Sequence, residues 1–225
     1  MMVAVLLAVA GIAAADSDED ALKAVLEKVT DAETHCHIGT CYAEGKVVAK
    51  DEAEAVRWYR KAADQGYAEA QCRLGKWYTY HLTIGEKSQA AMWYRKAAEQ
   101  GHVVAQHELG LLYFLGIGGV TNNYLEAVRL FRKGAESGYV QSIHNLGSCY
   151  AEGKGEPQDW VEACRLYRKA ADMGLWDSQF NLGTCYDMGW GVEKNKEEAL
   201  KWYRKASAQG CKLADDMISK LTKKK

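Results

Sequence analysis

The chain has 225 residues, of which 48% are hydrophobic and 26% are charged, a composition typical of a folded protein and not of a disordered one. Lysine plus arginine (29) nearly equals aspartate plus glutamate (30), so the formal net charge is −1, which disfavours a nucleic-acid binder that depends on a basic face. A single proline and many Ala, Leu, Glu, Lys and Arg residues favour helices.

The chain begins with an uncharged apolar segment. Residues 1–15 (MMVAVLLAVAGIAAA) precede an abrupt acidic run, DSDED. Ala13 and Ala15 fit the small-residue pattern of a signal-peptide cleavage site, and the segment is shorter than the ~20 apolar residues of a membrane span. We therefore predict a signal peptide at 1–15, no stable membrane span, and a secreted, periplasmic or endoplasmic-reticulum location. No Lys or Arg precedes the apolar stretch, so an uncleaved apolar capping helix in a cytoplasmic protein is the alternative.

An acidic segment and a capping helix are expected at residues 16–31.

From residue 32 onward, a glycine recurs at a regular interval. Successive copies are 36, 35, 37 and 36 residues apart, each follows Leu or Ile, and a tyrosine comes three residues later. These positions share one helical face. Because glycine costs about 1 kcal/mol of helix propensity relative to alanine, we predict that it makes room for a packed helix. The glycines predicted to be structurally critical are Gly39, Gly75, Gly110, Gly147 and Gly183.

A second block, WYRKAA in its first two copies, recurs in phase with this glycine. Its first copy places Ala55, Trp58, Tyr59 and Ala62 at the i, i+3, i+4, i+7 spacing of a buried helical stripe, while the regular arginines of the block are expected on a solvated outer face. Further glycines lie between and after the blocks, as at helix ends. Each unit is therefore predicted to be helix, turn, helix, turn, and the units must stack to bury their apolar faces.

The predicted array spans residues 32–215 and is followed by a basic tail at 216–225. The boundaries predicted for its five units are 32–67, 68–102, 103–139, 140–175 and 176–211.

At these residues the chain resembles the Sel-one-like repeat family, which is related to the tetratricopeptide repeats. Residues 178–192, SQFNLGTCYDMGWGV, follow the family pattern A-x-x-x-L-G-x-x-Y-x-x-G-x-G-V almost completely, and residues 198–206 follow its second block. The resemblance covers about residues 32–211 and implies an all-α fold, a right-handed α-solenoid of about five helix-turn-helix repeats with a concave inner face. It also implies a protein-interaction adaptor and no enzyme, without a cofactor. A cysteine-rich bacterial branch of the family that binds or hydrolyses β-lactams supplies the alternative function.

Seven cysteines raise the question of disulfides. Cys41, Cys149 and Cys185 precede the repeat tyrosine, and Cys164 stands where other copies have an apolar residue, so buried free thiols are the simplest interpretation. The cysteine-rich branch implies bridges from one repeat's second helix to the next repeat's first helix, and this chain has alanine where the first of those cysteines would stand. A disulfide between Cys149 and Cys164, on the two antiparallel helices of the fourth unit, is the alternative.

No catalytic or metal site is predicted. His35-Cys36-His37 with Cys41 suggests zinc only weakly, since a further ligand would have to come from elsewhere. No serine has a lysine three residues on, as the Ser-x-x-Lys motif of serine β-lactamases requires, and no Gly-x-Ser-x-Gly motif occurs.

In related tetratricopeptide arrays the first helix of each unit lines the binding groove. By analogy, positions three before, one after and four after the repeat glycine are candidates for contact with a partner protein or peptide segment. The candidates are Lys76, His107, Leu111, Phe114, His144, Ser148, Phe180 and Thr184. We therefore predict a scaffold that recognises another protein through its concave face.

Overall fold

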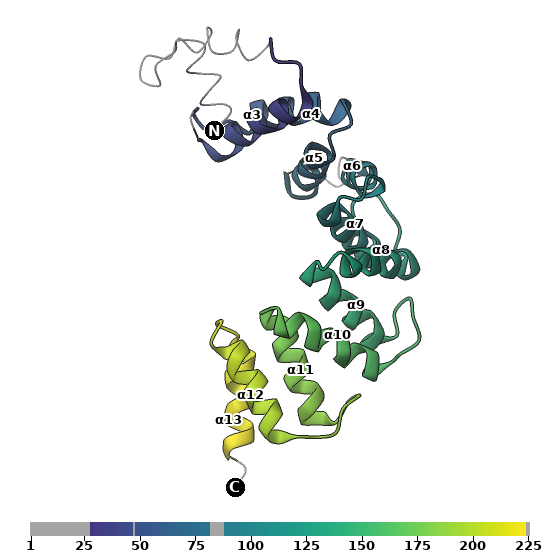
Figure 1. Cartoon of the computed structure of the whole chain (residues 1–225), viewed down its shortest axis with the longest axis vertical. Helices are drawn as coiled ribbons and strands as arrows, with labels where there is room; N and C mark the ends of the chain where they lie inside the picture. Colours follow the sequence, from purple (N-terminus) through teal and green to yellow (C-terminus); the bar gives the residue numbers. More distant parts are fainter. Residues whose placement is uncertain (1–27, 47, 82–87, 224–225) are drawn as a thin grey trace. The chain divides into compact units, whose positions relative to one another are not determined.

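A computed structural model of the chain describes residues 28–46, 48–81 and 88–223 (Figure 1). Every regular element in these ranges is an α-helix, which confirms the predicted all-α fold of stacked helix-turn-helix repeats. The helices are α3 (Ala32–Glu44), α4 (Glu52–Asp64), α5 (Ala68–His81), α6 (Ser88–Glu99), α7 (Val103–Leu115), α8 (Tyr124–Glu136), α9 (Val140–Glu152), α10 (Trp160–Asp172), α11 (Trp176–Met188), α12 (Lys196–Ser207) and α13 (Lys212–Lys223).

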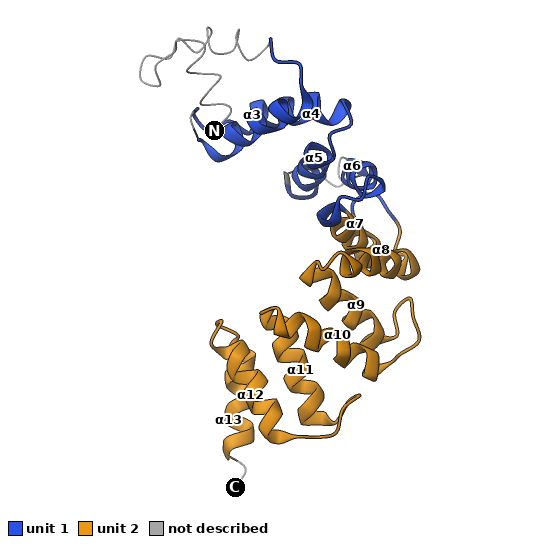
Figure 2. Ribbon diagram, in the orientation of Figure 1, with its two compact units in different colours: residues 1–105, 118–120 blue, residues 106–117, 121–225 orange. Residues whose placement is uncertain are grey.

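Two compact units make up the chain (Figure 2). Unit 1 comprises residues 1–105 and 118–120 and contains α3 to α6, whereas unit 2 comprises residues 106–117 and 121–225 and contains most of α7 together with α8 to α13. Within each unit a repeat is an antiparallel pair such as α3 with α4 or α9 with α10, and the second helix packs on the first helix of the following repeat, as α10 does on α11.

The two helices of a repeat are bounded by different residues. The second helices α4, α8, α10 and α12 start at side-chain caps, where the oxygen of Asp51, Asn123, Asp159 or Asn195 accepts a hydrogen bond from a backbone N–H of the first turn. The first helices α9 and α11 each end at a left-handed glycine, with φ of 67° at Gly153 and 77° at Gly189. These residues direct the chain back on itself at both ends of the pair.

The repeat glycine is covered by an aromatic ring from the second helix of its own repeat. A Cβ added at Gly75 would lie 2.6 Å from a ring carbon of Tyr94, and one at Gly147 would lie 3.0 Å from a ring carbon of Tyr167. The pairs are Gly39 with Tyr59, Gly75 with Tyr94, Gly110 with Phe131, Gly147 with Tyr167 and Gly183 with Tyr203. The absence of a side chain at these five positions is therefore what allows the two helices of each repeat to pack this closely.

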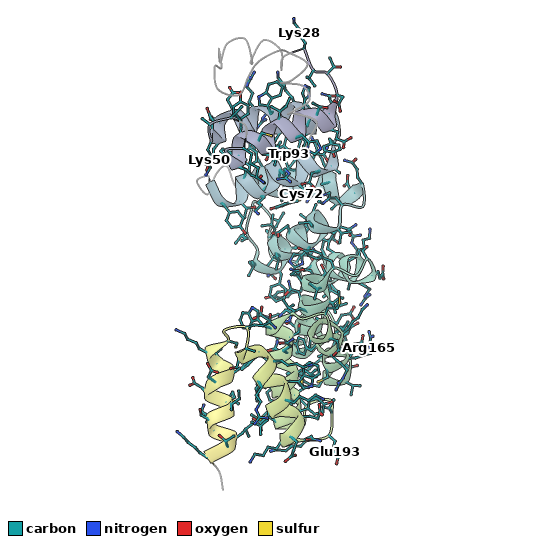
Figure 3. All side chains as sticks on the ribbon, turned by 60° about the vertical axis from the view of Figure 1, so that its left-hand side comes forward. Lys28, Lys50, Cys72, Trp93, Arg165 and Glu193 are labelled. Carbon is teal, nitrogen blue, oxygen red and sulfur yellow. The ribbon has the colours of Figure 1, made fainter. Side chains whose placement is uncertain are left out.

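The buried stripe of the second block forms the core as predicted. Ala55, Trp58 and Ala62 are 2%, 0% and 0% exposed. Figure 3 shows Trp93 among the helices of unit 1, where it is buried, and Arg165 at the outside of unit 2.

The arginines of the second block do more than face solvent. Arg132 Nη2 donates a hydrogen bond of 3.1 Å to the hydroxyl of Tyr150, and Arg168 donates to the hydroxyl of Tyr186. Each bond joins a second helix to the recurring tyrosine of the following repeat, so within unit 2 it fastens consecutive repeats together.

Helix α13 extends the repeat pattern into the segment where a basic tail was predicted. Ala214, Ile218 and Leu221 occupy the positions that hold a small residue, Leu or Ile, and an apolar residue in the first helices upstream. They pack toward α12 in a cluster with Tyr203; Ala214 is fully buried there, and Ile218 and Leu221 are partly buried. Residues 216–223 are thus helical and part of the packed structure, and α13 covers the last pair of helices in unit 2.

Of the N-terminal predictions, residues 1–15 and most of 16–31 lie outside the described residues. Within 28–46, 48–81 and 88–223, none of the helices has the length and apolar character that crossing a bilayer requires.

Candidate functional site

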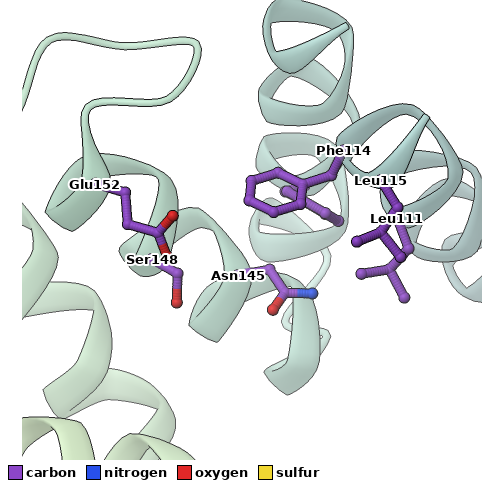
Figure 4. A pocket seen from close by; sticks show the side chains of 7 residues that line it. Leu111, Phe114, Leu115, Asn145, Ser148 and Glu152 are labelled. Atoms are coloured by element: carbon purple, nitrogen blue, oxygen red, sulfur yellow. The ribbon is translucent and has the colours of Figure 1, made fainter. Parts of the chain in front are cut away.

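The first of two neighbouring pockets in unit 2 lies between α7 and α9 and has a volume of about 250 Å³. Its side chains come from these two helices, namely Leu111, Phe114, Leu115, Asn145, Ser148 and Glu152 (Figure 4), and from Phe131 of α8. The Glu152 carboxylate at the rim is 2.6 Å from Lys154 Nζ, and that ammonium lies 5.0 Å from the centroid of the Phe114 ring. The pocket is therefore an apolar hollow with polar edges and a compensated charge.

The second pocket, of about 220 Å³, adjoins the first, because Ser148 and Glu152 line both. Helices α9, α10 and α11 and the turn after α11 build it. Apart from the small apolar Ala151, the rest of its lining is aromatic or polar: Trp160, Tyr167, Asn181, Thr184 and Trp190. Together the two pockets offer hollows between three consecutive first helices.

A pair of tryptophans forms one wall of the second pocket. The rings of Trp160 and Trp190 are 4.5 Å apart between centroids, with an angle of 32° between their planes. Trp190 precedes Gly191, where φ is 65° and an added Cβ would lie 2.0 Å from the carbonyl oxygen of Trp160. The Cys164 thiol donates a 2.9 Å hydrogen bond to the Trp190 carbonyl. Gly191 and Cys164 thus hold the turn against α10, while the Trp190 side chain stays 42% exposed.

Buried phenols fix the hydroxyl groups that face this pocket. Tyr167 Oη donates to Ser148 Oγ at 3.2 Å, and Tyr203 Oη donates to Thr184 Oγ1 at 3.2 Å. Burial raises the pKa of Tyr167 and of Tyr203 to about 12, so both phenols keep their protons at neutral pH. Ser148 and Thr184 are therefore held in place as hydrogen-bonding groups.

Four of the eight predicted contact residues line these pockets: Leu111, Phe114, Ser148 and Thr184. Their contact with a partner remains a prediction. Of the others, Lys76 lies exposed on α5 in unit 1 and lines neither pocket, and Phe180 is half-buried with its ring 5.5 Å from that of Tyr203.

The two predicted histidines join repeats. His107 is only 5% exposed, and its Nδ1 lies 3.1 Å from Ser142 Oγ. His144 Nδ1 likewise lies 2.7 Å from Ser178 Oγ. Burial lowers the pKa of His107 to about 4, with a smaller contribution from the nearby His144, whose own pKa is lowered by burial. Both rings are thus neutral at pH 7, and the structure gives His107 a place inside the stack instead of on a binding surface.

The disulfide proposed between Cys149 and Cys164 is not formed, and all seven cysteines are free thiols. Cys149 packs in one layer, against Phe131 and Leu146, whereas Cys164 packs in the next layer with Cys185. Because the two sulfurs belong to different layers on either side of α10, the antiparallel pairing of α9 and α10 does not bring them together. Burial raises the pKa of Cys149 to about 12.

The histidines of the weak zinc hypothesis have other partners. His35 Nε2 lies 2.8 Å from the Val29 carbonyl oxygen, which must accept, so its Nδ1 accepts from Gln65 Nε2 at 3.0 Å. His37 is exposed and 3.7 Å from a Glu33 oxygen. In the described part of the chain, no group of three His, Cys, Asp or Glu side chains is arranged to hold a metal ion.

The pocket residues that stand two before and five after the repeat glycine were not among the predicted contact residues. Asn145 and Asn181 hold the first of these positions, and Leu115 and Glu152 hold the second. Two continuous stripes on the first helix pass through the residue directly after the repeat glycine. Counted from that glycine, one stripe holds positions −3, +1 and +4, and the other holds positions −2, +1 and +5. The packing of the following repeat takes up His107 at −3, whereas Phe114 and Ala151 at +4 still line the pockets. For Trp190 the sequence offered a clue, because this large aromatic residue stands between the two turn glycines, Gly189 and Gly191.

Comparison with known proteins identifies the repeat. A family model described as Sel1 repeat matches residues 32–67, 68–102, 103–139, 140–175 and 176–211. Among curated proteins, none is similar enough to this chain to count as a relative.

Solved structures share the fold. A Sel1 repeat protein from Oxalobacter formigenes is 34% identical over 84% of this chain and 76% of its own, with a TM-score of 0.78. The protein c5321, a protective antigen of uropathogenic Escherichia coli with an SLR fold, is 35% identical over 92% of this chain, with a TM-score of 0.82. This chain spans 44% of that antigen. A sel1 repeat protein from Klebsiella pneumoniae, 21% identical over 86% of this chain and 94% of its own (TM-score 0.53), is similar in fold alone.

Proposed function

The chain belongs to the Sel1 repeat family, and from that premise we propose that it is a scaffold that binds an extended segment of a partner protein along the first helices of unit 2. Sel1 repeat proteins generally act as protein-interaction scaffolds, and the partner of this chain is what the proposal adds. The observation that carries it is the pair of adjoining pockets that share Ser148 and Glu152. Contiguous hollows between consecutive helices suit a partner segment that crosses those helices.

Exposed apolar side chains beside the pockets support this assignment. Leu115 and Trp190 are 59% and 42% exposed, and each lines one of the two pockets. Single exposed apolar residues are ordinary, but apolar residues gathered around concave pockets are typical of an interaction site. The polar groups between them, Asn145, Ser148 and Asn181, offer donors and acceptors to a partner's backbone.

Two matched leucine variants test the proposal. Leu115 lines the first pocket, whereas Leu125 on α8 is 72% exposed and lines neither pocket. The full chain and its L115R and L125R variants would be cross-linked to proteins of the native source, and the captured partners identified by mass spectrometry. We expect L125R to retain a partner that L115R loses, with equal melting temperatures. Capture of the same partners by all three proteins would show that the pockets are not the binding site.

The alternative function, binding or hydrolysis of β-lactams, rests on the resemblance to the cysteine-rich branch alone. The free cysteines do not provide the inter-helix bridges of that branch.

Export is a separate proposal, based on the apolar segment at residues 1–15. Cleavage after this segment would place the scaffold in the periplasm, the endoplasmic reticulum or the extracellular medium. Intact mass of the protein isolated from its native source tests this: loss of residues 1–15 supports export, and a full-length mass refutes it.

A further inference from the structure

We propose that Cys164 and Cys185 form an oxidation site, in which hydrogen peroxide joins the two thiols in a disulfide and thereby loosens the turn that carries Trp190. The site lies beside the second pocket and exists whether or not that pocket binds a partner.

The two thiols meet where α10 packs on α11. Cys164 lies in the second turn of α10 and Cys185 in the last turn of α11, far from the short turn that connects these helices. Both side chains belong to one buried layer, at 2% and 1% exposed, and a hydrogen bond joins their thiols. Because a disulfide needs its sulfurs at about 2.05 Å, hydrogen-bonded thiols on neighbouring helices are well placed to form one.

The preceding layer of unit 2 lacks such a pair. There, Val128 of α8 and Cys149 of α9 hold the equivalent positions of the repeat and pack in one cluster. Cys149 is as buried as Cys185, but its counterpart on the second helix carries no thiol. Cys149 is therefore a matched internal control, a buried cysteine at the same register position that has no thiol at the position of Cys164.

The contact makes the two sulfurs chemically different. The hydrogen bond from the Cys185 thiol lowers the pKa of Cys164, and the Arg168 guanidinium lowers it further, against the effect of burial. The same hydrogen bond, together with burial, raises the pKa of Cys185. Since the thiolate is the reactive form of cysteine, Cys164 reacts first and Cys185 completes the disulfide.

The reaction balances with hydrogen peroxide as the oxidant. The Cys164 thiolate attacks one peroxide oxygen, the O–O bond breaks, and the products are a sulfenic acid on Cys164 and hydroxide, which takes up the proton that Cys164 released. The Cys185 sulfur then attacks the Cys164 sulfur, the S–O bond breaks, and the hydroxyl leaves as water with the Cys185 proton. In total, two thiols are oxidised to one disulfide and one peroxide is reduced to two waters. A peroxide molecule is little larger than water, which suits two thiols that are almost fully buried.

Oxidation removes a hydrogen bond that holds one wall of the second pocket. The Cys164 thiol is the 2.9 Å donor to the Trp190 carbonyl oxygen, and a disulfide has no S–H group. Trp190 lines the second pocket, with its ring 4.5 Å from that of Trp160. The oxidised protein keeps the close approach at Gly191 but loses the thiol contact, so its turn after α11 is less restrained.

Peptide mapping detects the disulfide directly. The reduced full-length chain would be treated with hydrogen peroxide under native conditions, alkylated with iodoacetamide in urea and digested with trypsin. Cleavage after Lys and Arg places Cys149, Cys164 and Cys185 in separate peptides, 134–154, 155–165 and 170–194. We expect peptides 155–165 and 170–194 to be linked, to separate on reduction, and to become linked at least about tenfold faster than Cys149 is oxidised.

Three serine variants assign the roles of the thiols. C185S removes the second thiol, so peroxide should leave a sulfenic acid on Cys164 that dimedone traps. C164S keeps a hydroxyl donor for the Trp190 carbonyl, and peroxide should leave its Cys185 unmodified. C149S is the matched control and should form the same disulfide as the wild type.

Amide hydrogen exchange measures the effect on the turn. We expect peroxide to speed the exchange of residues 189–195 about fivefold in the wild type, as the loss of one hydrogen bond implies, and to leave it unchanged in C164S. Absence of the linked peptides, oxidation of Cys149 at the same rate, or unchanged exchange of the turn in the oxidised wild type would each overturn the inference.

Discussion

Replacing Gly75 with alanine tests directly why the repeat glycine is there. A Cβ at this position would lie 2.6 Å from Tyr94 Cδ1, about 0.8 Å inside ordinary van der Waals contact, which begins near 3.4 Å. Tyr94 is 0% exposed, so its ring has no open space to move into. Overpacking of this kind costs up to about 3 kcal/mol, and alanine returns about 1 kcal/mol of helix propensity. We expect G75A to lower the free energy of unfolding by about 2 kcal/mol.

The assay is urea-induced unfolding followed by circular dichroism, in which this loss lowers the midpoint by roughly 0.7–1 M for m-values of about 2–3 kcal/mol/M. G147A is the graded control, because its Cβ would lie 3.0 Å from the nearest Tyr167 carbon and needs a smaller adjustment. In a Y94L background, where the ring is gone, G75A should cost little or nothing. An unchanged midpoint for G75A, or the same loss in the Y94L background, would refute the close-packing explanation.

Three further predictions concern pH, helix capping and thiol reactivity. His107 has a pKa of about 4 in the folded chain and ~6.5 when unfolded, so its contribution to stability is complete above pH 6.5 and declines as the pH falls toward 4. Between pH 7.5 and 5.0 the wild type should therefore lose about 2 kcal/mol of unfolding free energy that H107Q does not lose. Equal pH dependence of the unfolding free energy in the two proteins would contradict this. D159A removes the acceptor of the Val161 and Glu162 N–H groups and should lower the free energy of unfolding by ~1 kcal/mol in the urea assay, whereas no change would show that water replaces the cap. Cys149, buried and with its pKa raised to about 12, should resist iodoacetamide at pH 8 in the native protein and react in concentrated urea, and rapid native labelling detected by mass spectrometry would contradict its packing.

The fold was predictable because its determinants are local and repeated. Glycine and the aromatic block recur in phase in five copies, and a capping Asp or Asn precedes the second helix in four of them, so the copies report the same two helices. The aromatic ring against the glycine follows from this phase, since Trp58 and Tyr59 lie in one buried stripe whose second ring reaches Gly39. A misassigned residue in one copy changes little, because the other copies agree.

The pocket residues were predictable only in part, for a geometric reason. Leu111 and Ser148 stand one residue after the glycine, a position shared by two candidate stripes, and both line pockets. His107 stands on the stripe that the following repeat covers, and its contact with Ser142 spans 35 residues of sequence. No local pattern tells a side chain that meets solvent from one that meets the next repeat. The free thiols of Cys149 and Cys164 show the same limit, because which layer a side chain enters depends on packing.

The same packing divides the first helix into positions that hold the array and positions that are free to vary. In α9 the glycine at 147 receives the ring of its own repeat, His144 bonds to the following repeat, and Tyr150 receives Arg132 from the preceding one. These contacts do not involve the first-helix positions −2, +1 and +5 or the residue between the two turn glycines. Those positions line the pockets, with Asn145 among them, together with Phe114 and Ala151 at +4 and with Phe131, Trp160 and Tyr167 of the second helices. A repeat protein built in this way can change its partner without weakening its stack, so partner specificity in unit 2 should reside in these positions and not in the recurring motif.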